Sequence, residues 1–158
     1  LIRNGQPFAP TTLEEFNIID GAAEAVSALN KAGFLTIVVT NQPDVGNGLV
    51  DQIIVDTIHK QLCDLMPLTD VKVCFHTADD HCLCRKPLPG MIMEAAETHQ
   101  IDLRASFLVG DRWRDIDTAY SVGVTSFFID YGYSEKLNQI PDYTIENLAE
   151  ATRIILSL

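Results

Sequence analysis

Short runs of apolar and β-branched residues recur along the chain, and amphipathic stretches separate them. Residues 33–40 read Gly-Phe-Leu-Thr-Ile-Val-Val-Thr, which is typical of a strand buried on both faces. Similar runs are found at 71–75, 105–109 and 124–129. Helical spacing of apolar residues is present at 22–32, 50–65, 91–99, in the stretch ending near Gly123 and at 145–156. This alternation predicts an α/β fold with a Rossmann-like parallel sheet and helices on both faces.

The 158 residues are enough for one sizeable core, so we predict a single domain spanning residues 1–158. We find no insertion large enough to form a cap domain. Residues 1–19 do not follow the alternation of strands and helices. We predict an ordered loop there, which could include a short strand or flap.

The charge of the chain argues against a nucleic-acid-binding surface. The formal net charge is -11, and the 11 Lys and Arg residues form no basic run that could neutralise a phosphate backbone. The longest apolar stretches, at 34–39 and 124–129, are far too short to cross a bilayer. We see no signal peptide, although the chain starts at Leu1 rather than Met. The cytoplasm is therefore the predicted compartment.

Cys74, His76, Cys82 and Cys84 fall within eleven residues. Three thiolates and one imidazole suit a tetrahedral zinc ion. Because no position would remain open for water, we predict a structural zinc site in a loop at about 74–84, with His81 as the reserve ligand. A disulfide fits a cytoplasmic chain less well, and cysteines that are merely buried would not require His76 between them.

Polar side chains follow three of the predicted strands, where parallel sheets bind their ligands. Thr40 and Asn41 can donate hydrogen bonds to a phosphoryl oxygen, or they can simply cap a turn. Lys86 can neutralise a transferring phosphoryl group, although a lone lysine is usually solvated. Asp111 and Asp115 can bind Mg²⁺, and Asp111 can also cap the following helix.

Considered jointly, these motifs resemble the histidinol-phosphatase and heptose-bisphosphate phosphatase group of the haloacid dehalogenase superfamily. The resemblance covers most of the chain, from about Gly21 to Asp130. It rests on Thr40-Asn41-Gln42, Cys74-x-His76, Cys82-x-Cys84-Arg85-Lys86-Pro87-x-Pro89-Gly90-Met91 and Gly110-Asp111-x3-Asp115.

The resemblance implies a phosphatase that hydrolyses a phosphate monoester on a small metabolite, such as a phosphorylated sugar or a histidinol-phosphate-like compound. By this resemblance, Thr40-Asn41 would hold the phosphate and Lys86 would bridge the phosphate and the nucleophile. Asp111 would ligate a catalytic Mg²⁺, with Asp115 supporting either the metal or Lys86. Arg85 would face the substrate. The reaction would pass through an aspartyl-phosphate, a form of covalent catalysis.

The chain departs from the family in two places. The family's Asp-x-Asp-Gly-Thr/Val motif supplies the nucleophile and the general acid and base, whereas the only Asp-x-Asp here is 115–117, inside a predicted helix. Leu1-Ile2-Arg3-Asn4 resembles the residues that follow that motif, so we expect the nucleophile to lie upstream of Leu1 in the natural chain. Asn47 also replaces the family's Arg, which leaves the substrate open.

Two competing hypotheses follow from the missing motif. One is a non-catalytic family member that binds a phosphorylated ligand or a protein. The other is a zinc-stabilised interaction domain without a phosphate site. The sequence predicts no oligomeric state.

Overall fold

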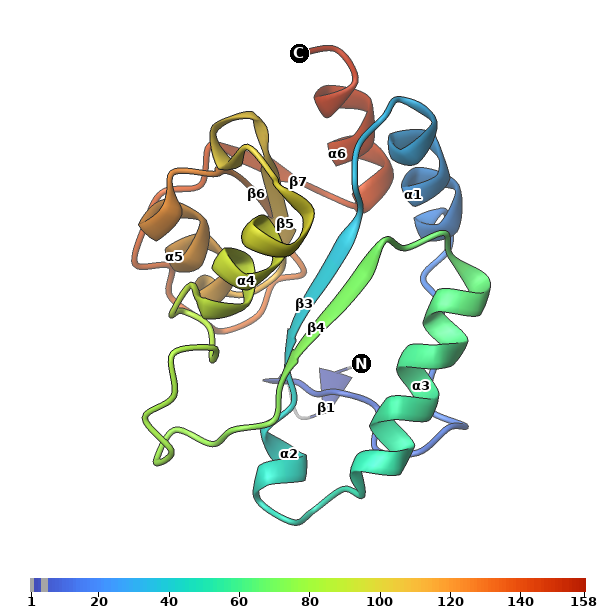
Figure 1. The fold of residues 1–158 in the computed structure, drawn as a ribbon, viewed down its shortest axis with the longest axis vertical. Helices are drawn as coiled ribbons and strands as arrows, with labels where there is room; N and C mark the ends of the chain where they lie inside the picture. The colour runs from blue at the N-terminus through green and yellow to red at the C-terminus, as the bar shows by residue number, and fades with distance from the viewer. Residues whose placement is uncertain (1, 4–5) are drawn as a thin grey trace. The chain divides into compact units, whose positions relative to one another are not determined.

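The computed structural model of the protein describes residues 2–3 and 6–158. The chain forms two compact units, Leu1–His81 and Cys82–Leu158, whose elements are labelled in Figure 1. Leu1 and Asn4, which entered the comparison with the family's first motif, lie outside the described residues. The prediction of a single domain stays a prediction.

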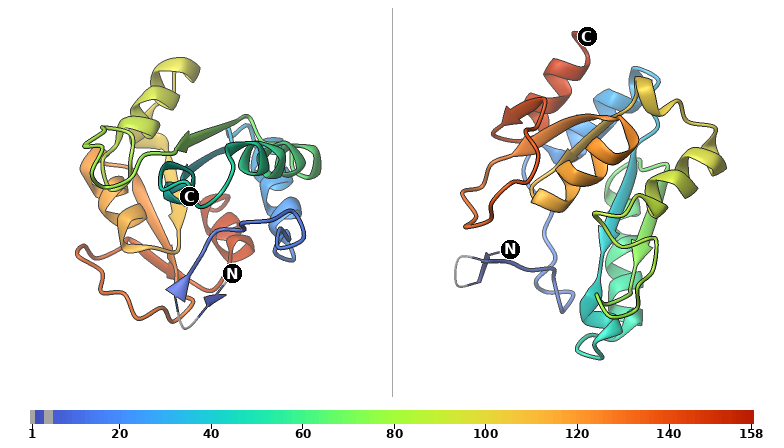
Figure 2. Two further views of the ribbon diagram at one scale, coloured as in Figure 1. Left: turned by 90° about the horizontal axis from the view of Figure 1, so that it is seen from below. Right: turned by 90° about the vertical axis from the view of Figure 1, so that its left-hand side faces the viewer.

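The first unit is built on two parallel strands. β3 pairs with β4 from Ile37↔Asp70 to Asn41↔Cys74. α1 and α3 lie on the same side of this pair (Figures 1 and 2). The elements in chain order are β1 (Ile2–Arg3), β2 (Gln6–Pro7), α1 (Ala22–Lys31), β3 (Ile37–Asn41), α2 (Pro43–Gly46), α3 (Gln52–Leu65) and β4 (Asp70–Cys74).

The helices of this unit form where apolar residues recur at helical spacing. α1 buries Ala25, Val26 and Leu29, which recur at helical spacing. α3 begins after Asp51, whose side chain accepts a hydrogen bond from the Ile53 backbone N–H at 2.9 Å, a standard N-terminal cap.

The second unit contains a three-stranded parallel sheet in the order β5-β6-β7. α5 lies on one face of this sheet and α6 on the other (Figures 1 and 2). Phe127 is fully buried and stacks on Tyr143 with ring centroids 4.5 Å apart. The elements are α4 (Gly90–His99), the 3₁₀ turn η1 (Leu103–Ala105), β5 (Phe107–Gly110), α5 (Trp113–Val122), β6 (Thr125–Ile129), β7 (Tyr143–Ile145) and α6 (Leu148–Ile155).

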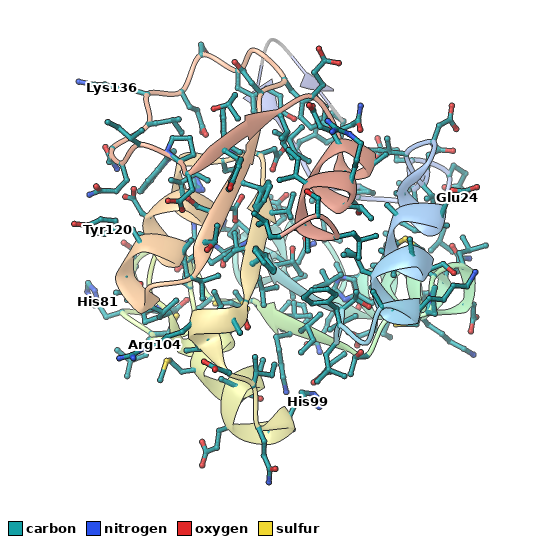
Figure 3. All side chains as sticks on the ribbon, turned by 90° about the horizontal axis from the view of Figure 1, so that it is seen from above. Glu24, His81, His99, Arg104, Tyr120 and Lys136 are labelled. Atoms are coloured by element: carbon teal, nitrogen blue, oxygen red, sulfur yellow. The ribbon has the colours of Figure 1, made fainter. Side chains whose placement is uncertain are left out.

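Both units confirm the predicted α/β class with parallel strand pairing. Among the described residues, no segment forms a large cap domain, also as predicted. Tyr120 near the end of α5 is 70% exposed, and Figure 3 shows its side chain pointing away from the helix.

The predicted and observed elements differ mostly at their ends. The strand predicted for 33–40 begins only at Ile37, because Gly33 has a left-handed φ of 95° and leaves α1 in a turn. Within residues 1–19, predicted as a loop, β1 and β2 form a short antiparallel pair. The sequence patterns missed α2 and β7, which have four and three residues.

No helix in the described part of the chain has both the length and the apolar character that a membrane span requires. The predicted cytoplasmic location stays a prediction.

Candidate active site and metal centre

Lys86 and Asp115 form a buried ion pair in the second unit. The Lys86 Nζ lies 2.6 Å from the Asp115 Oδ1, and the two side chains are 13% and 8% exposed. The backbone N–H of Arg112 donates to the other carboxylate oxygen, Oδ2, at 3.1 Å. Both oxygens of Asp115 therefore have protein donors, an arrangement suited to holding the Lys86 ammonium in place.

The position of Asp115 follows from the start of α5. Asp115 is the third residue of this helix, and its carboxylate accepts a hydrogen bond from a backbone N–H that the helix itself leaves unsatisfied. The alternative that Asp111 caps this helix is wrong, because the N-cap residue of α5 is Arg112. Gly110 supplies the space: a Cβ at this position would overlap the Asp115 side chain.

Asp111 directly follows β5, as the strand pattern predicted. The Tyr133 hydroxyl donates to its Oδ2 at 3.0 Å. Within residues 2–3 and 6–158, no hydrogen bond reaches the Oδ1 of Asp111. Mg²⁺ prefers oxygen ligands such as carboxylates, and this oxygen could therefore bind the ion.

The pKa of Tyr133 is raised by burial first, and then by the negative charge of Asp111. Tyr133 therefore keeps its proton at neutral pH and remains a hydrogen-bond donor to this carboxylate.

The β6–β7 loop (residues 130–142) carries functional candidates that the sequence patterns missed. The guanidinium of Arg112 makes two hydrogen bonds to the Glu135 carboxylate, with Nε 2.7 Å from Oε2. This bidentate pair lowers the pKa of Glu135 and raises that of Arg112. Asn138 donates to the Asp117 Oδ2 at 2.8 Å, so Tyr133, Glu135 and Asn138 all hold the loop against the segment 111–117.

Thr40 and Asn41 end β3 in the first unit. Asn41 is aligned with Cys74, and the backbone N–H of Gln42 donates to the Cys74 carbonyl at 2.8 Å. The Gln42 side chain donates to the Thr40 hydroxyl at 3.4 Å. Both residues thus lie at the carboxyl end of a parallel pair, where ligands bind in such sheets. Their role in holding phosphate stays a prediction, as does that of Arg85.

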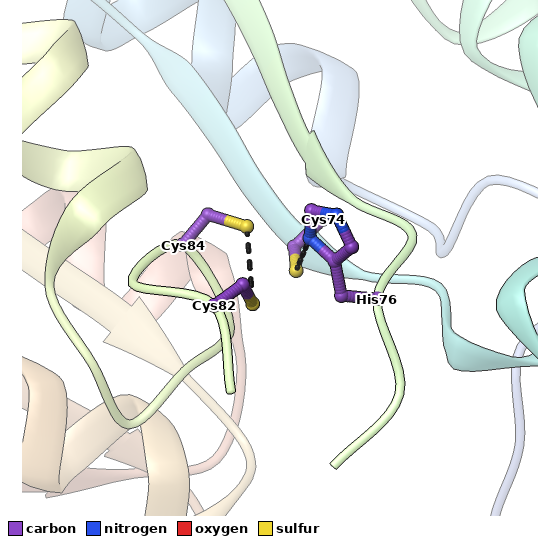
Figure 4. Close-up of side chains that lie close together, drawn as sticks. All are labelled: Cys74, His76, Cys82 and Cys84. Atoms are coloured by element: carbon purple, nitrogen blue, oxygen red, sulfur yellow. Dashed lines mark hydrogen bonds between the residues drawn. The ribbon is translucent and has the colours of Figure 1, made fainter. Parts of the chain in front are cut away.

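The Cys/His group has distances suited to a tetrahedral metal ion (Figure 4). The Cys74 Sγ lies 3.7 Å from the His76 Nδ1, and the Cys82 and Cys84 Sγ atoms are 3.4 Å apart. All four candidate ligand atoms lie within 4.8 Å of one another. Tetrahedral zinc with Zn–S bonds of about 2.3 Å places its sulfurs about 3.8 Å apart.

A disulfide between Cys82 and Cys84 does not match this geometry. Their 3.4 Å separation is far longer than an S–S bond of about 2 Å. His81, the reserve ligand, is exposed and is not one of the four residues whose side chains could together hold a metal ion. Its side chain points away from the ribbon in Figure 3. His76 is therefore the candidate imidazole ligand.

Two glycines allow the backbone to approach closely at these cysteine-bearing segments. A Cβ at Gly46 would overlap the carbonyl of Phe75, between Cys74 and His76. A Cβ at Gly90 would overlap the Leu83 carbonyl, to which the Gly90 N–H donates at 3.0 Å. Such close approaches require glycine.

Comparison with known proteins identifies the family. A family model described as HAD-hyrolase-like matches residues 83–151. The D-glycero-beta-D-manno-heptose-1,7-bisphosphate 7-phosphatase of Pseudomonas putida is 32% identical over 154 residues, which cover 92% of this chain and 88% of that relative. The chain belongs to the haloacid dehalogenase superfamily. This confirms the resemblance to its heptose-bisphosphate phosphatase group.

Other members of this superfamily agree in sequence and fold. The Escherichia coli K12 protein of the same name is 29% identical over 90% of this chain and 83% of its own length. The crystal structure of D,D-heptose 1.7-bisphosphate phosphatase from B. bronchiseptica, complexed with magnesium and phosphate, has a TM-score of 0.84 and 28% identity. The match covers 93% of this chain and 88% of that one. A HAD-like phosphatase from Mesorhizobium loti matches with a TM-score of 0.76 at 21% identity, over 93% and 78% of the two chains, and supports the fold alone.

Proposed function

We propose that this protein is a Mg²⁺-dependent phosphatase that hydrolyses a phosphate monoester on a phosphorylated sugar. The observation that carries the proposal is the largely buried Lys86–Asp115 ion pair, 2.6 Å between Nζ and Oδ1, in which Asp115 lies four residues after Asp111 at the end of β5. A lysine fixed in this way provides a positive charge for a phosphoryl group. The names of the relatives favour D-glycero-beta-D-manno-heptose-1,7-bisphosphate as the substrate.

In the proposed reaction, the aspartate that the family's Asp-x-Asp motif supplies attacks the phosphorus atom, and the bond to the sugar oxygen breaks. The second carboxylic acid of the same motif protonates the leaving oxygen. Water then attacks the aspartyl-phosphate, gives its proton to that carboxylate, and releases inorganic phosphate with the original aspartate.

The residues of this chain would stabilise the phosphoryl group throughout. Lys86 would neutralise part of its negative charge, with Asp115 fixing the position of the ammonium. The Thr40 hydroxyl and the Asn41 amide would donate hydrogen bonds to the phosphoryl oxygens. Asp111 would hold Mg²⁺, which supplies further charge neutralisation when bound. The magnesium in the B. bronchiseptica structure supports this cofactor.

We also propose a structural zinc ion on Cys74, His76, Cys82 and Cys84. The ligand set and its spacing support this site. Such an ion would close the loop that leads directly into Arg85 and Lys86, and so restrict where these two side chains can lie. With four protein ligands, it would leave no position for a reacting water.

A competing hypothesis is a family member that binds a phosphorylated ligand without hydrolysing it. The only Asp-x-Asp of this sequence lies at 115–117, inside α5. There Asp115 forms an ion pair with Lys86. The intact mass of the natural protein under denaturing conditions, with N-terminal sequencing, separates the two hypotheses. A mass above 17.5 kDa and an upstream Asp-x-Asp support the phosphatase, whereas a mass equal to this chain favours the binding protein.

A further inference from the structure

The Tyr133 hydroxyl joins the β6–β7 loop to the residue proposed to bind Mg²⁺. It lies 3.0 Å from the Asp111 Oδ2, although 22 positions separate the two residues in the sequence. We infer that Tyr133 is a positioning residue, whose hydrogen bond to Oδ2 orients the Asp111 carboxylate so that Oδ1 faces the divalent cation. This inference rests on the proposed function, because it concerns the same metal.

The hydrogen bond has one direction. A phenol that keeps its proton donates, and an ionised carboxylate only accepts. With Oδ2 engaged by Tyr133, Oδ1 is the oxygen available to a cation. Fixing the outer oxygen of a metal-binding carboxylate is a common way in which proteins orient a ligand.

Two neighbouring groups restrict the Tyr133 ring. The Tyr131 ring lies against it, with centroids 5.8 Å apart and planes tilted by 46°. The Arg112 guanidinium carbon lies 6.0 Å from the centre of the Tyr133 ring, within the range of a cation–π contact. Because these contacts already restrict the Tyr133 side chain, its hydrogen bond to Asp111 costs little additional conformational entropy.

The Glu135–Arg112 pair fixes the loop at a second point, next to the bond between Tyr133 and Asp111. Arg112 directly follows Asp111, and Glu135 is two residues after Tyr133. The Tyr133–Asp111 hydrogen bond and the Arg112–Glu135 ion pair are adjacent, so together they restrict the orientation of the loop as well as its position. The two hydrogen bonds of the Arg112–Glu135 pair also require one relative geometry of the two side chains. The loop therefore supports Asp111 through a side-chain bond and through the backbone of its neighbour.

The test measures metal binding by the natural protein carrying Tyr133→Phe, with the metal alone as probe. Free Mn²⁺ is counted by EPR during a titration, and Mg²⁺ affinity follows from competition. We expect Mn²⁺ and Mg²⁺ to bind about 10-fold more weakly or worse, as is typical when a group supporting a metal ligand is removed. The Mg²⁺ concentration for half-maximal turnover should rise by a similar factor, while kcat at saturating Mg²⁺ changes less.

Tyr131→Phe is the matched control, because it removes a hydroxyl from the same loop and leaves the Asp111 bond intact. Its metal affinity should equal that of the wild type. Should Tyr133→Phe fail to fold, Glu135→Gln is the second variant, and it should weaken Mn²⁺ binding several-fold by loosening the loop.

Wild-type metal affinity in a folded Tyr133→Phe variant would overturn the inference. Asp111→Asn distinguishes that result from a failure of the proposed function. If Asp111→Asn loses metal while Tyr133→Phe does not, the Mg²⁺ site stands and only the role of Tyr133 is wrong. If Asp111→Asn binds Mn²⁺ as the wild type does, the proposed Mg²⁺ site is wrong, and the inference is overturned with it.

Discussion

Asp115 fixes Lys86 through a 2.6 Å contact between Oδ1 and Nζ, and the backbone N–H of Arg112 holds its second oxygen. The carboxylate thus links the start of α5 to the segment that follows the cysteine group. Burying two charges is costly unless each is paired and hydrogen-bonded, and this pair meets that condition. We therefore expect the free energy of unfolding to fall when either Lys86 or Asp115 is replaced.

Asp115→Asn should destabilise the fold and reduce turnover. Lys86, whose side chain is only 13% exposed, would lose the charge of Asp115, and breaking such a pair typically costs about 3 kcal/mol or more in the free energy of unfolding. Urea unfolding of the single variants and of Lys86→Gln/Asp115→Asn measures the coupling. The double variant should lose at least about 1 kcal/mol less than the sum of the singles. Strict additivity would show that the two side chains do not interact.

Gly110→Ala should impair both catalysis and stability. The new methyl group would overlap the Asp115 carboxylate and displace it from Lys86. Gly123→Ala is the control, because a Cβ there meets no atom but must adopt a left-handed φ of 69°. That control should lose about 1 kcal/mol of stability with kcat unchanged. Equal kcat values in the two variants would contradict this account of Gly110.

Cys82→Ser should lower both the zinc content and the melting temperature. A structural zinc ion contributes its binding free energy to folding. Mass spectrometry of the purified protein counts the zinc, and thermal unfolding with and without a chelator measures its effect on stability. Cys63→Ser is the matched control, because Cys63 is an exposed free cysteine outside the group. One zinc ion per chain retained by Cys82→Ser would refute the four-ligand site.

The Arg112–Glu135 pair should give a stability contribution that depends on pH. The bond to Arg112 holds the pKa of Glu135 below its ordinary value of 4.5. The stabilisation is therefore fully present above pH 4.5 and is lost as the pH falls through the lower, folded-state pKa. Glu135→Gln should be less stable than the wild type at pH 7, and the difference should shrink below pH 4.5.

The measurement is the free energy of unfolding at pH 7, 4.5 and 3, with Glu97→Gln as control. Glu97 is exposed on α4 and has no ion pair within the described residues. Its substitution removes the same charge without breaking a contact. A stability difference for Glu135→Gln that stays constant with pH would contradict the assigned role of the Arg112 bond.

The sequence patterns located the strands β3 to β6 and drew attention to polar residues that follow some of them, but they missed the β6–β7 loop. β5 and β6 were predictable because their apolar runs are buried in a parallel sheet. Asp111 drew attention because it directly follows β5, and Lys86 because it follows the cysteine group in the motif Arg85-Lys86-Pro87. Tyr133 and Glu135 lie on an irregular loop, and their partners are 22 and 23 positions away. No local pattern encodes these distant contacts.

The role of Asp115 illustrates the same limit. Its spacing from Asp111 was compatible with binding the metal or supporting Lys86, and the sequence could not choose between them. In the structure, Lys86 and the Arg112 backbone occupy both oxygens, which favours support of Lys86. A polar or aromatic pair directly after a buried strand, as at Tyr131 and Tyr133, is the signal that could have drawn attention to this loop.

The central claim is tested most directly by inorganic phosphate release from D-glycero-beta-D-manno-heptose-1,7-bisphosphate. The assay compares the natural protein with its Lys86→Ala variant, each with Mg²⁺ and with excess EDTA. We predict Mg²⁺-dependent release by the wild type and a fall in kcat of about 10²-fold or more in the variant. No release by a folded wild type carrying the upstream Asp-x-Asp, or equal release by the variant, would contradict the account.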